Sequence, residues 1–149
     1  MPTQGQRNDI EAAVQEVKEG ASIGNLIERH PEVFVKYSRG LNQVRLHYQG
    51  RRRWKTEVFW FYGETGTGKS LEASERFPEA YYKMSTNKWW DGYDGHDVVI
   101  IDDYRRDLCS FGDMLRLFDR YPLLVESKGG TLQFLARTIV VTTPKSPLS

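Results

Sequence analysis

The chain has 149 residues, of which 39% are hydrophobic and 28% are charged, so it can bury a core and disorder is not the default. Its formal net charge of +1 excludes a strongly basic domain and does not by itself indicate nucleic-acid binding. Cys109 is the single cysteine, which excludes an intrachain disulfide and a cysteine-based metal site. The apolar runs are too short to span a bilayer and the N-terminus lacks a secretory signal. We therefore expect a soluble intracellular protein with no membrane partner.

The first 50 residues are predicted to form short helices. Apolar residues recur with helical spacing over 10–17, Ser22 is a candidate cap for a second helix, and Pro31 suits the first turn of a third. Gly40 is expected to break that helix before a weaker fourth over 41–48. Short helices with narrow apolar stripes need partners. The sequence leaves two alternatives, an ordinary small helical bundle and an oligomerisation domain.

A polar, basic segment at 49–56 marks the predicted boundary between these helices and the rest of the chain. It contains Arg51, Arg52 and Arg53 directly before Trp54. Arginines beside a tryptophan can grip phosphate and stack a base, although runs of this kind more often form solvated linkers. Both interpretations stay open at this point.

From residue 57 onward, short apolar runs alternate with helical patterns. The first run is continuous and rich in β-branched and aromatic residues, which is typical of a strand in a buried parallel sheet. Alternating strands and helices predict an α/β fold whose ligands bind at the carboxyl ends of the strands. The predicted strands are 58–62, 80–83, 97–101 and 138–142.

Two further features are predicted between the last two strands. Ser110 with Asp113 is a capping signature before an apolar helical pattern. The segments 123–126 and 131–134 flank the Gly129-Gly130 pair, which predicts a β-hairpin.

A phosphate-binding loop is predicted at 63–70, which fits the pattern G-x-x-x-x-G-K-[ST] in full between a strand and a helix. Its glycines let backbone N–H groups approach a phosphate closely, and the next helix points its positive end at the anion. Lys69 is expected to contact the β- and γ-phosphates and the Ser70 hydroxyl to bind Mg²⁺. We therefore predict ATP and Mg²⁺ as cofactors. The loop residues are Gly63, Glu64, Thr65, Gly66, Thr67, Gly68, Lys69 and Ser70.

Two aspartates follow the apolar run 98–101. Asp102 is the expected Mg²⁺ ligand, directly or through water, and Asp103 the residue that polarises the water attacking the γ-phosphate. An apolar strand that ends in two acids is common by itself, but after a complete phosphate loop it predicts the rest of a nucleotide-hydrolysing site. The sequence after Asn87-Lys88 does not match a guanine-recognition motif, which argues against a small GTPase, while the choice between ATP and other triphosphates stays open.

Several further stretches, taken in order, resemble the helicase domain of the replication initiator proteins of circular single-stranded DNA viruses, especially circoviruses. That domain is a superfamily 3 helicase with an AAA+-like core, and the resemblance covers nearly the whole chain. Besides the phosphate loop, it is carried by NKWWDGY at 87–93, VVIIDD at 98–103, LRLFDRYP at 115–122, ESKGGT at 126–131 and FLAR at 134–137.

The resemblance implies an architecture and a function. Residues 1–50 would be a helical oligomerisation domain and residues 51–149 a P-loop ATPase and helicase core. Family members form homohexameric rings that bind ATP between subunits and hold single-stranded DNA in the channel. A protein of this kind would act in the host nucleus during rolling-circle replication.

The resemblance also implies roles for particular residues. Lys128, with Gly129 and Gly130 beside it, would contact DNA phosphates from the hairpin, which suits a recognition that is blind to base sequence. A routine turn lysine is the alternative. For the aromatic cluster Trp89, Trp90 and Tyr93, packing in the core or at a subunit interface is expected rather than base stacking.

Two departures from the family pattern stand out. Pro144 occupies the place of an asparagine that senses the γ-phosphate, so the Thr142 or Thr143 hydroxyl would have to substitute, and Thr143 is our catalytic candidate. The chain also ends before the expected arginine finger and lacks the nuclease motifs of the family, so we expect a fragment truncated at the C-terminus.

The leading hypothesis is an ATP-driven helicase and translocase. The alternative, motivated by Pro144, is a nucleotide-gated oligomeric DNA-binding module with little hydrolysis. A P-loop kinase is disfavoured because no acceptor site and no arginine-rich lid are apparent.

Overall fold

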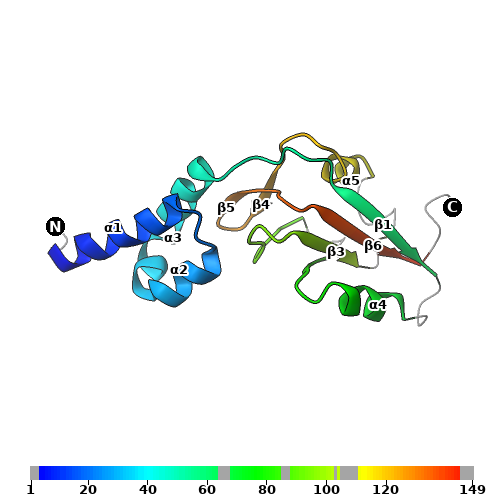
Figure 1. Ribbon diagram of the computed structural model, residues 1–149, viewed down its shortest axis with the longest axis horizontal. Coiled ribbons are helices and arrows are strands. Elements are labelled where there is room, and N and C mark those ends of the chain that lie inside the picture. Colours follow the sequence, from blue (N-terminus) through cyan, green and yellow to red (C-terminus); the bar gives the residue numbers. More distant parts are fainter. Residues whose placement is uncertain (1–3, 64–67, 85–87, 103, 105–110, 145–149) are drawn as a thin grey trace.

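The computed structural model describes residues 4–63, 68–84, 88–102, 104 and 111–144, without the side chains of residues 4–6, 69, 70, 111 and 113. Figure 1 shows helices at the N-terminal end, a sheet with further helices at the C-terminal end, and a linker that joins the two parts. We call these parts the helical unit and the sheet unit. No helix in the described part of the chain is long and apolar enough to cross a membrane.

The helical unit consists of α1 (Gln4–Lys18), α2 (Ile23–Arg29) and α3 (Pro31–Tyr48). As predicted, Ser22 caps α2, because its hydroxyl accepts a hydrogen bond from the Asn25 backbone N–H at 3.1 Å. The predicted proline start of α3 is also confirmed. The three helices enclose a small apolar cluster of their own, formed by Ala13, Val17, Leu26, Val33 and Leu41.

The predicted break at Gly40 is wrong, because α3 continues through that residue. The helix is instead distorted at Tyr37, whose backbone has φ −126° and ψ 23°. A glycine inside a helix costs only about 1 kcal/mol. Val33 and Leu41, on either side of the glycine, both pack into the same apolar cluster and hold the helix together.

The sheet unit is built on a parallel sheet of β1 (Glu57–Tyr62), β2 (Tyr81–Met84), β3 (Val98–Asp102) and β6 (Thr138–Thr143). The strands are ordered β1-β6-β3-β2. Ile139 and Val141 face the main core, whereas the intervening Val140 packs with Ile100 and Ala73 toward α4 (Lys69–Arg76). The predicted α/β fold with a parallel sheet is confirmed.

The predicted hairpin is confirmed as a separate antiparallel pair of β4 (Leu124–Ser127) and β5 (Gly130–Gln133). Its turn consists of Lys128 and Gly129, one residue earlier than the glycine pair suggested, and Gly130 begins β5 with φ 148°. The helix before the hairpin is α5 (Phe111–Leu117). The proposed capping signature of α5 lies outside the described residues.

The linker is fixed to the sheet unit by Arg52, which is only 1% exposed. Its guanidinium donates hydrogen bonds to the carbonyl oxygens of Arg116 at 3.0 Å, Leu117 at 2.7 Å and Tyr121 at 2.7 and 3.0 Å. It also donates to the Thr56 hydroxyl at 3.0 Å. Arg52 therefore caps the C-terminal end of α5. The sequence left open a solvated linker and a phosphate-binding segment. Both interpretations are wrong for Arg52, because its guanidinium is buried and bonded to the protein itself.

Candidate functional site

The predicted phosphate loop begins where β1 ends and finishes where α4 begins. Gly63 follows β1, and its backbone N–H donates to the Thr143 carbonyl oxygen at 3.2 Å. Gly68 precedes α4 with φ +81°, a conformation that favours glycine. Lys69 and Ser70 form the first residues of α4, with their side chains outside the described part. Of the other predicted loop residues, Glu64, Thr65, Gly66 and Thr67 lie outside it as well.

The strand order brings the predicted chemical groups to one edge of the sheet. β6 lies between β1 and β3, so the polar end of β6 separates the phosphate loop from Asp102. Tyr62 is paired with Thr143, and Ile101 with Val141. Because parallel strands end at the same edge, Gly63, the two threonines of β6 and Asp102 meet there. Asp103, predicted to polarise the attacking water, lies outside the described residues.

Thr142 contacts Asp102 directly, since its hydroxyl donates a hydrogen bond to Asp102 Oδ1 at 2.7 Å. Thr142 is fully buried, and its carbonyl oxygen accepts the backbone N–H of Tyr104 at 2.7 Å. The pleat of β6 places Thr142 on the same face as Val140, which is the face covered by α4. Thr143, our catalytic candidate, follows the alternation to the opposite face and stays a prediction.

A second feature is the hairpin turn, where Lys128 is exposed to solvent. The backbone N–H of Lys128 donates to the Asp91 carboxylate at 2.8 Å. The loop before β3 also holds the hairpin strand, because the backbone N–H of Trp90 donates to the Glu126 carbonyl oxygen at 2.8 Å. The turn that carries Lys128 is thus fastened to this loop at two points. DNA contact by Lys128, Gly129 and Gly130 stays a prediction.

The aromatic cluster serves the core, as expected for two of its members. Trp90 is 6% exposed and Tyr93 is 1% exposed, and both belong to the main core cluster. Tyr81 stacks on Trp90 with ring centroids 5.7 Å apart. Burial raises the pKa of Tyr93 to about 12. Its hydroxyl accepts a hydrogen bond from the Leu135 backbone N–H at 3.0 Å, which fixes the segment after β5.

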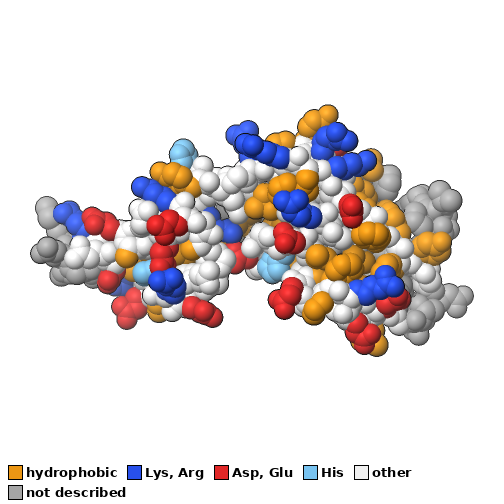
Figure 2. All heavy atoms as spheres, viewed as in Figure 1, with side chains coloured by type: hydrophobic (Ala, Val, Ile, Leu, Met, Phe, Trp, Pro, Cys, Tyr) orange, Lys and Arg blue, Asp and Glu red, His pale blue; other side chains and the backbone are white. Residues whose placement is uncertain are grey.

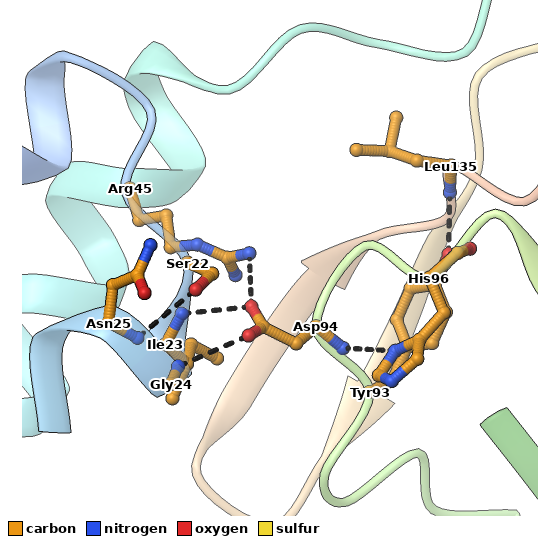
Figure 3. A network of polar contacts seen from close by, with 9 residues as sticks. All are labelled: Ser22, Ile23, Gly24, Asn25, Arg45, Tyr93, Asp94, His96 and Leu135. Carbon is orange, nitrogen blue, oxygen red and sulfur yellow. Dashed lines mark hydrogen bonds and ion pairs between the residues drawn. The ribbon is translucent and has the colours of Figure 1, made fainter. Parts of the chain in front are cut away.

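Asp94 joins the sheet unit to the helical unit (Figure 3). Its carboxylate accepts the backbone N–H groups of Ile23 at 2.9 Å and Gly24 at 3.2 Å, at the positive end of α2. It also pairs with Arg45 of α3 at 2.7 Å. On the other side, the Asp94 backbone N–H donates to His96 Nδ1 at 3.1 Å. The same loop therefore holds both the Lys128 turn and the helical unit.

The roles of Asp91, Asp94 and Arg52 were not predicted from the sequence. The one available signal was the Asp-Gly-Tyr-Asp-Gly run at 91–95, whose composition indicates tight turns in which carboxylates meet backbone N–H groups. The contacts of these side chains with residues far away in the chain could not be predicted from a local sequence pattern.

Comparison with known proteins gives a match to the RNA helicase family over residues 59–145. The chain is 47% identical to the replication-associated protein of porcine circovirus 2, over 98% of this chain and 48% of that protein. It is 44% identical to the goose circovirus replication-associated protein, over 96% and 49%, and 45% identical to that of porcine circovirus 1, over 97% and 47%. The chain spans about half the length of these curated relatives.

Proposed function

Because the chain belongs to the RNA helicase family, we propose that it is the ATP-driven motor of a viral rolling-circle replication protein. Its similarity to circovirus replication-associated proteins confirms the resemblance stated from its motifs. We propose further that it hydrolyses ATP in a homohexameric ring around single-stranded DNA, within the host nucleus. The observation that carries the proposal is the meeting of Gly63, Thr142 and Asp102 at one edge of the sheet.

The groups at this edge suit a nucleotide with Mg²⁺. A carboxylate on β3 and a serine hydroxyl at the start of α4 are oxygen donors of the kind that Mg²⁺ takes in such sites. When bound, the metal would neutralise charge on the phosphates. The chain itself would hold the phosphates with the backbone N–H groups of the loop and with Lys69. Thr142 would orient Asp102, and Asp103 would orient the attacking water.

The hairpin supports a contact with a nucleic-acid backbone. Lys128 is exposed at the turn, and Asp91 holds the peptide N–H of that same residue, so the backbone that carries the charge is held in place. The family name mentions RNA, whereas the similar viral proteins are named for replication. We propose single-stranded DNA as the substrate. Matched DNA and RNA oligonucleotides in a fluorescence-anisotropy titration distinguish the two, and preferential RNA binding would contradict the proposal.

Assembly through the helical unit is supported by the apolar side chains that it exposes. Val35 is 81% exposed, Tyr48 52%, Ile27 46% and Tyr37 44%. These side chains are available to be buried against a neighbouring subunit. Phosphate release measured across a dilution series, together with sedimentation, tests the ring. The proposal predicts that turnover per subunit falls as the assembly dissociates, and constant turnover during dissociation would contradict it.

The alternative, a nucleotide-gated DNA-binding module with little hydrolysis, is favoured by Pro144. This residue follows β6, where an asparagine would complete the site, and proline has no side-chain group to sense a phosphate. The alternative predicts tight nucleotide binding and nucleotide-dependent DNA retention with negligible phosphate release.

A further inference from the structure

The linker between the two units has a regular alternation of burial. Arg51, Arg53 and Lys55 are exposed, whereas Arg52 and Thr56 are buried and Trp54 is half-buried. This alternation of burial gives the linker an inner and an outer side. The outer side consists of the three cations.

The inner side is held by hydrogen bonds. Besides the contacts of Arg52 described above, the Trp54 indole N–H donates to the Ala136 carbonyl oxygen at 3.1 Å. The Thr56 hydroxyl donates to the same oxygen at 2.8 Å. The linker backbone is therefore held against the sheet unit, so only the outer side chains remain to be ordered when they bind a ligand.

Three more exposed cations lie beside the linker because its inner side contacts the segments that carry them. Arg52 bonds to the backbone of Arg116, and the Arg137 guanidinium lies 4.0 Å from the centre of the Trp54 ring. Figure 2 shows Lys and Arg side chains gathered over the linker and α5. None of these cations forms an ion pair within the described part of the chain. The basic strip, as we call this surface, consists of Arg51, Arg53, Lys55, Arg116, Arg120 and Arg137.

We propose that the basic strip binds the sugar-phosphate backbone of single-stranded nucleic acid, as a contact separate from Lys128. The strip lies at the base of the hairpin and Lys128 at its turn, so one strand could contact both only by following the length of β4 and β5. The inference rests on the proposed function, in which single-stranded DNA is the substrate.

The spacing of the cations favours this ligand. Arg51 and Arg53 are two positions apart before the bend at Trp54, so their Cα atoms lie at most roughly 7 Å apart, which is comparable with the distance between successive phosphates of a stretched single strand. Tyr121 stands among the cations and is 67% exposed, so a ring is available for a base to stack on. Three exposed acids, Glu57, Asp97 and Asp119, lie near the strip, against six cations. A cationic surface with an exposed ring suits a single strand better than it suits a protein partner.

The test is a titration of a labelled oligothymidylate by fluorescence anisotropy at several salt concentrations. The variant Arg51→Ala with Arg53→Ala removes two outer cations whose side chains make no hydrogen bond or ion pair within the described residues. We expect its affinity to fall about tenfold near physiological salt, and the slope of log K against log salt to fall by about 1.4, or about 0.7 per lost phosphate contact. A matched control, Lys36→Ala with Arg39→Ala, removes the same charge from exposed positions of α3. Because these positions lie beside the proposed assembly surface, sedimentation checks that the control assembles as the wild type does, and its affinity should then stay within about twofold.

Two comparisons sharpen the test. Arg51→Lys with Arg53→Lys keeps the charges and should retain most of the affinity, which a merely structural role of these positions does not predict. Lys128→Ala should weaken binding independently, so that its effect multiplies with that of the strip variant. If Lys128→Ala weakens binding but the strip variant matches its control, the strip proposal is overturned and the proposed function stands.

Other outcomes also decide the matter. Unchanged affinity with loss of assembly in sedimentation would assign the strip to a subunit contact instead. A wild-type chain that binds no single-stranded nucleic acid at all would overturn both proposals.

Discussion

The Asp91 carboxylate accepts a hydrogen bond from the backbone N–H of Lys128 at 2.8 Å, although 37 positions separate the two residues in the chain. The Asp91 carbonyl oxygen accepts the Tyr81 hydroxyl at 2.7 Å, which holds the aspartate in place. An acid beside a cation normally weakens the attraction of that cation for DNA. For the proposed contact of Lys128 with DNA, we expect the geometry of the turn to matter more than the added negative charge.

Two substitutions of Asp91 should distinguish the effect of the turn geometry on DNA binding from the effect of the negative charge of Asp91. Asp91→Ala removes the acceptor, and we expect it to weaken single-stranded DNA binding about threefold to tenfold, corresponding to a net contribution of about 1 kcal/mol from one exposed hydrogen bond. Asp91→Asn keeps an acceptor oxygen while removing the charge, so its affinity should equal or exceed that of the wild type. Anisotropy titrations measure both, and a higher affinity for the alanine variant would show that charge outweighs geometry.

A second prediction concerns the two threonines of β6. Thr142→Val keeps the shape of a buried side chain but removes the hydroxyl that donates to Asp102. Groups that orient a metal ligand typically contribute tenfold to a hundredfold, so we expect phosphate release to fall by about that factor. Thr143→Val is the matched control on the opposite face of the strand, and its effect should be smaller. The reverse order of effects would assign the role to Thr143, as our sequence analysis expected.

Arg52 should matter for stability. Arg52→Met fills similar space but leaves the partly buried carbonyl oxygens of Arg116, Leu117 and Tyr121 without their donor. We expect the free energy of unfolding in urea to fall by about 2 to 4 kcal/mol. The exposed neighbour Arg53 provides the control, since Arg53→Met should change stability by less than about 0.5 kcal/mol. Equal stability of the two variants would mean that the linker is not held as described.

Because Tyr93 is buried, we expect the stability of the protein to fall at alkaline pH. Burial raises its pKa to about 12, above the ordinary value of about 10, so the folded state holds this proton more tightly than the unfolded state. The resulting stability is fully present below about pH 10 and is lost as the pH rises toward about 12, by about 2 to 3 kcal/mol. Urea unfolding across this range should show a shallower decline for Tyr93→Phe than for the exposed control Tyr121→Phe. An identical decline of stability with pH in the two variants would contradict the raised pKa of Tyr93.

The fold was predictable where local patterns carry the information. The apolar runs that became β1, β3 and β6 are continuous, and the Ser22 cap and the Gly129-Gly130 pair act within a few residues. Gly40 misled the prediction because packing of Val33 and Leu41 outweighs the helix cost of one glycine.

The candidate site was predictable only in part. The phosphate-loop residues and Asp102 belong to contiguous motifs, so their spacing indicates their chemistry. The contact of Thr142 with Asp102 depends on β6 lying between β1 and β3, and the strand order is not written in any local pattern. The sequence likewise does not distinguish Arg52 from its neighbours Arg51 and Arg53. The burial of Arg52 depends on the position of α5, which lies more than sixty residues away in the chain.

The central claim is tested most directly by phosphate release from ATP with Mg²⁺, with and without single-stranded DNA, comparing the chain with Lys69→Ala at high protein concentration. We predict turnover that DNA stimulates and that the substitution lowers at least a hundredfold, because Lys69 supplies the positive charge at the phosphates. Turnover no higher than that of the variant, with nucleotide still bound, would contradict the motor and favour the nucleotide-gated module.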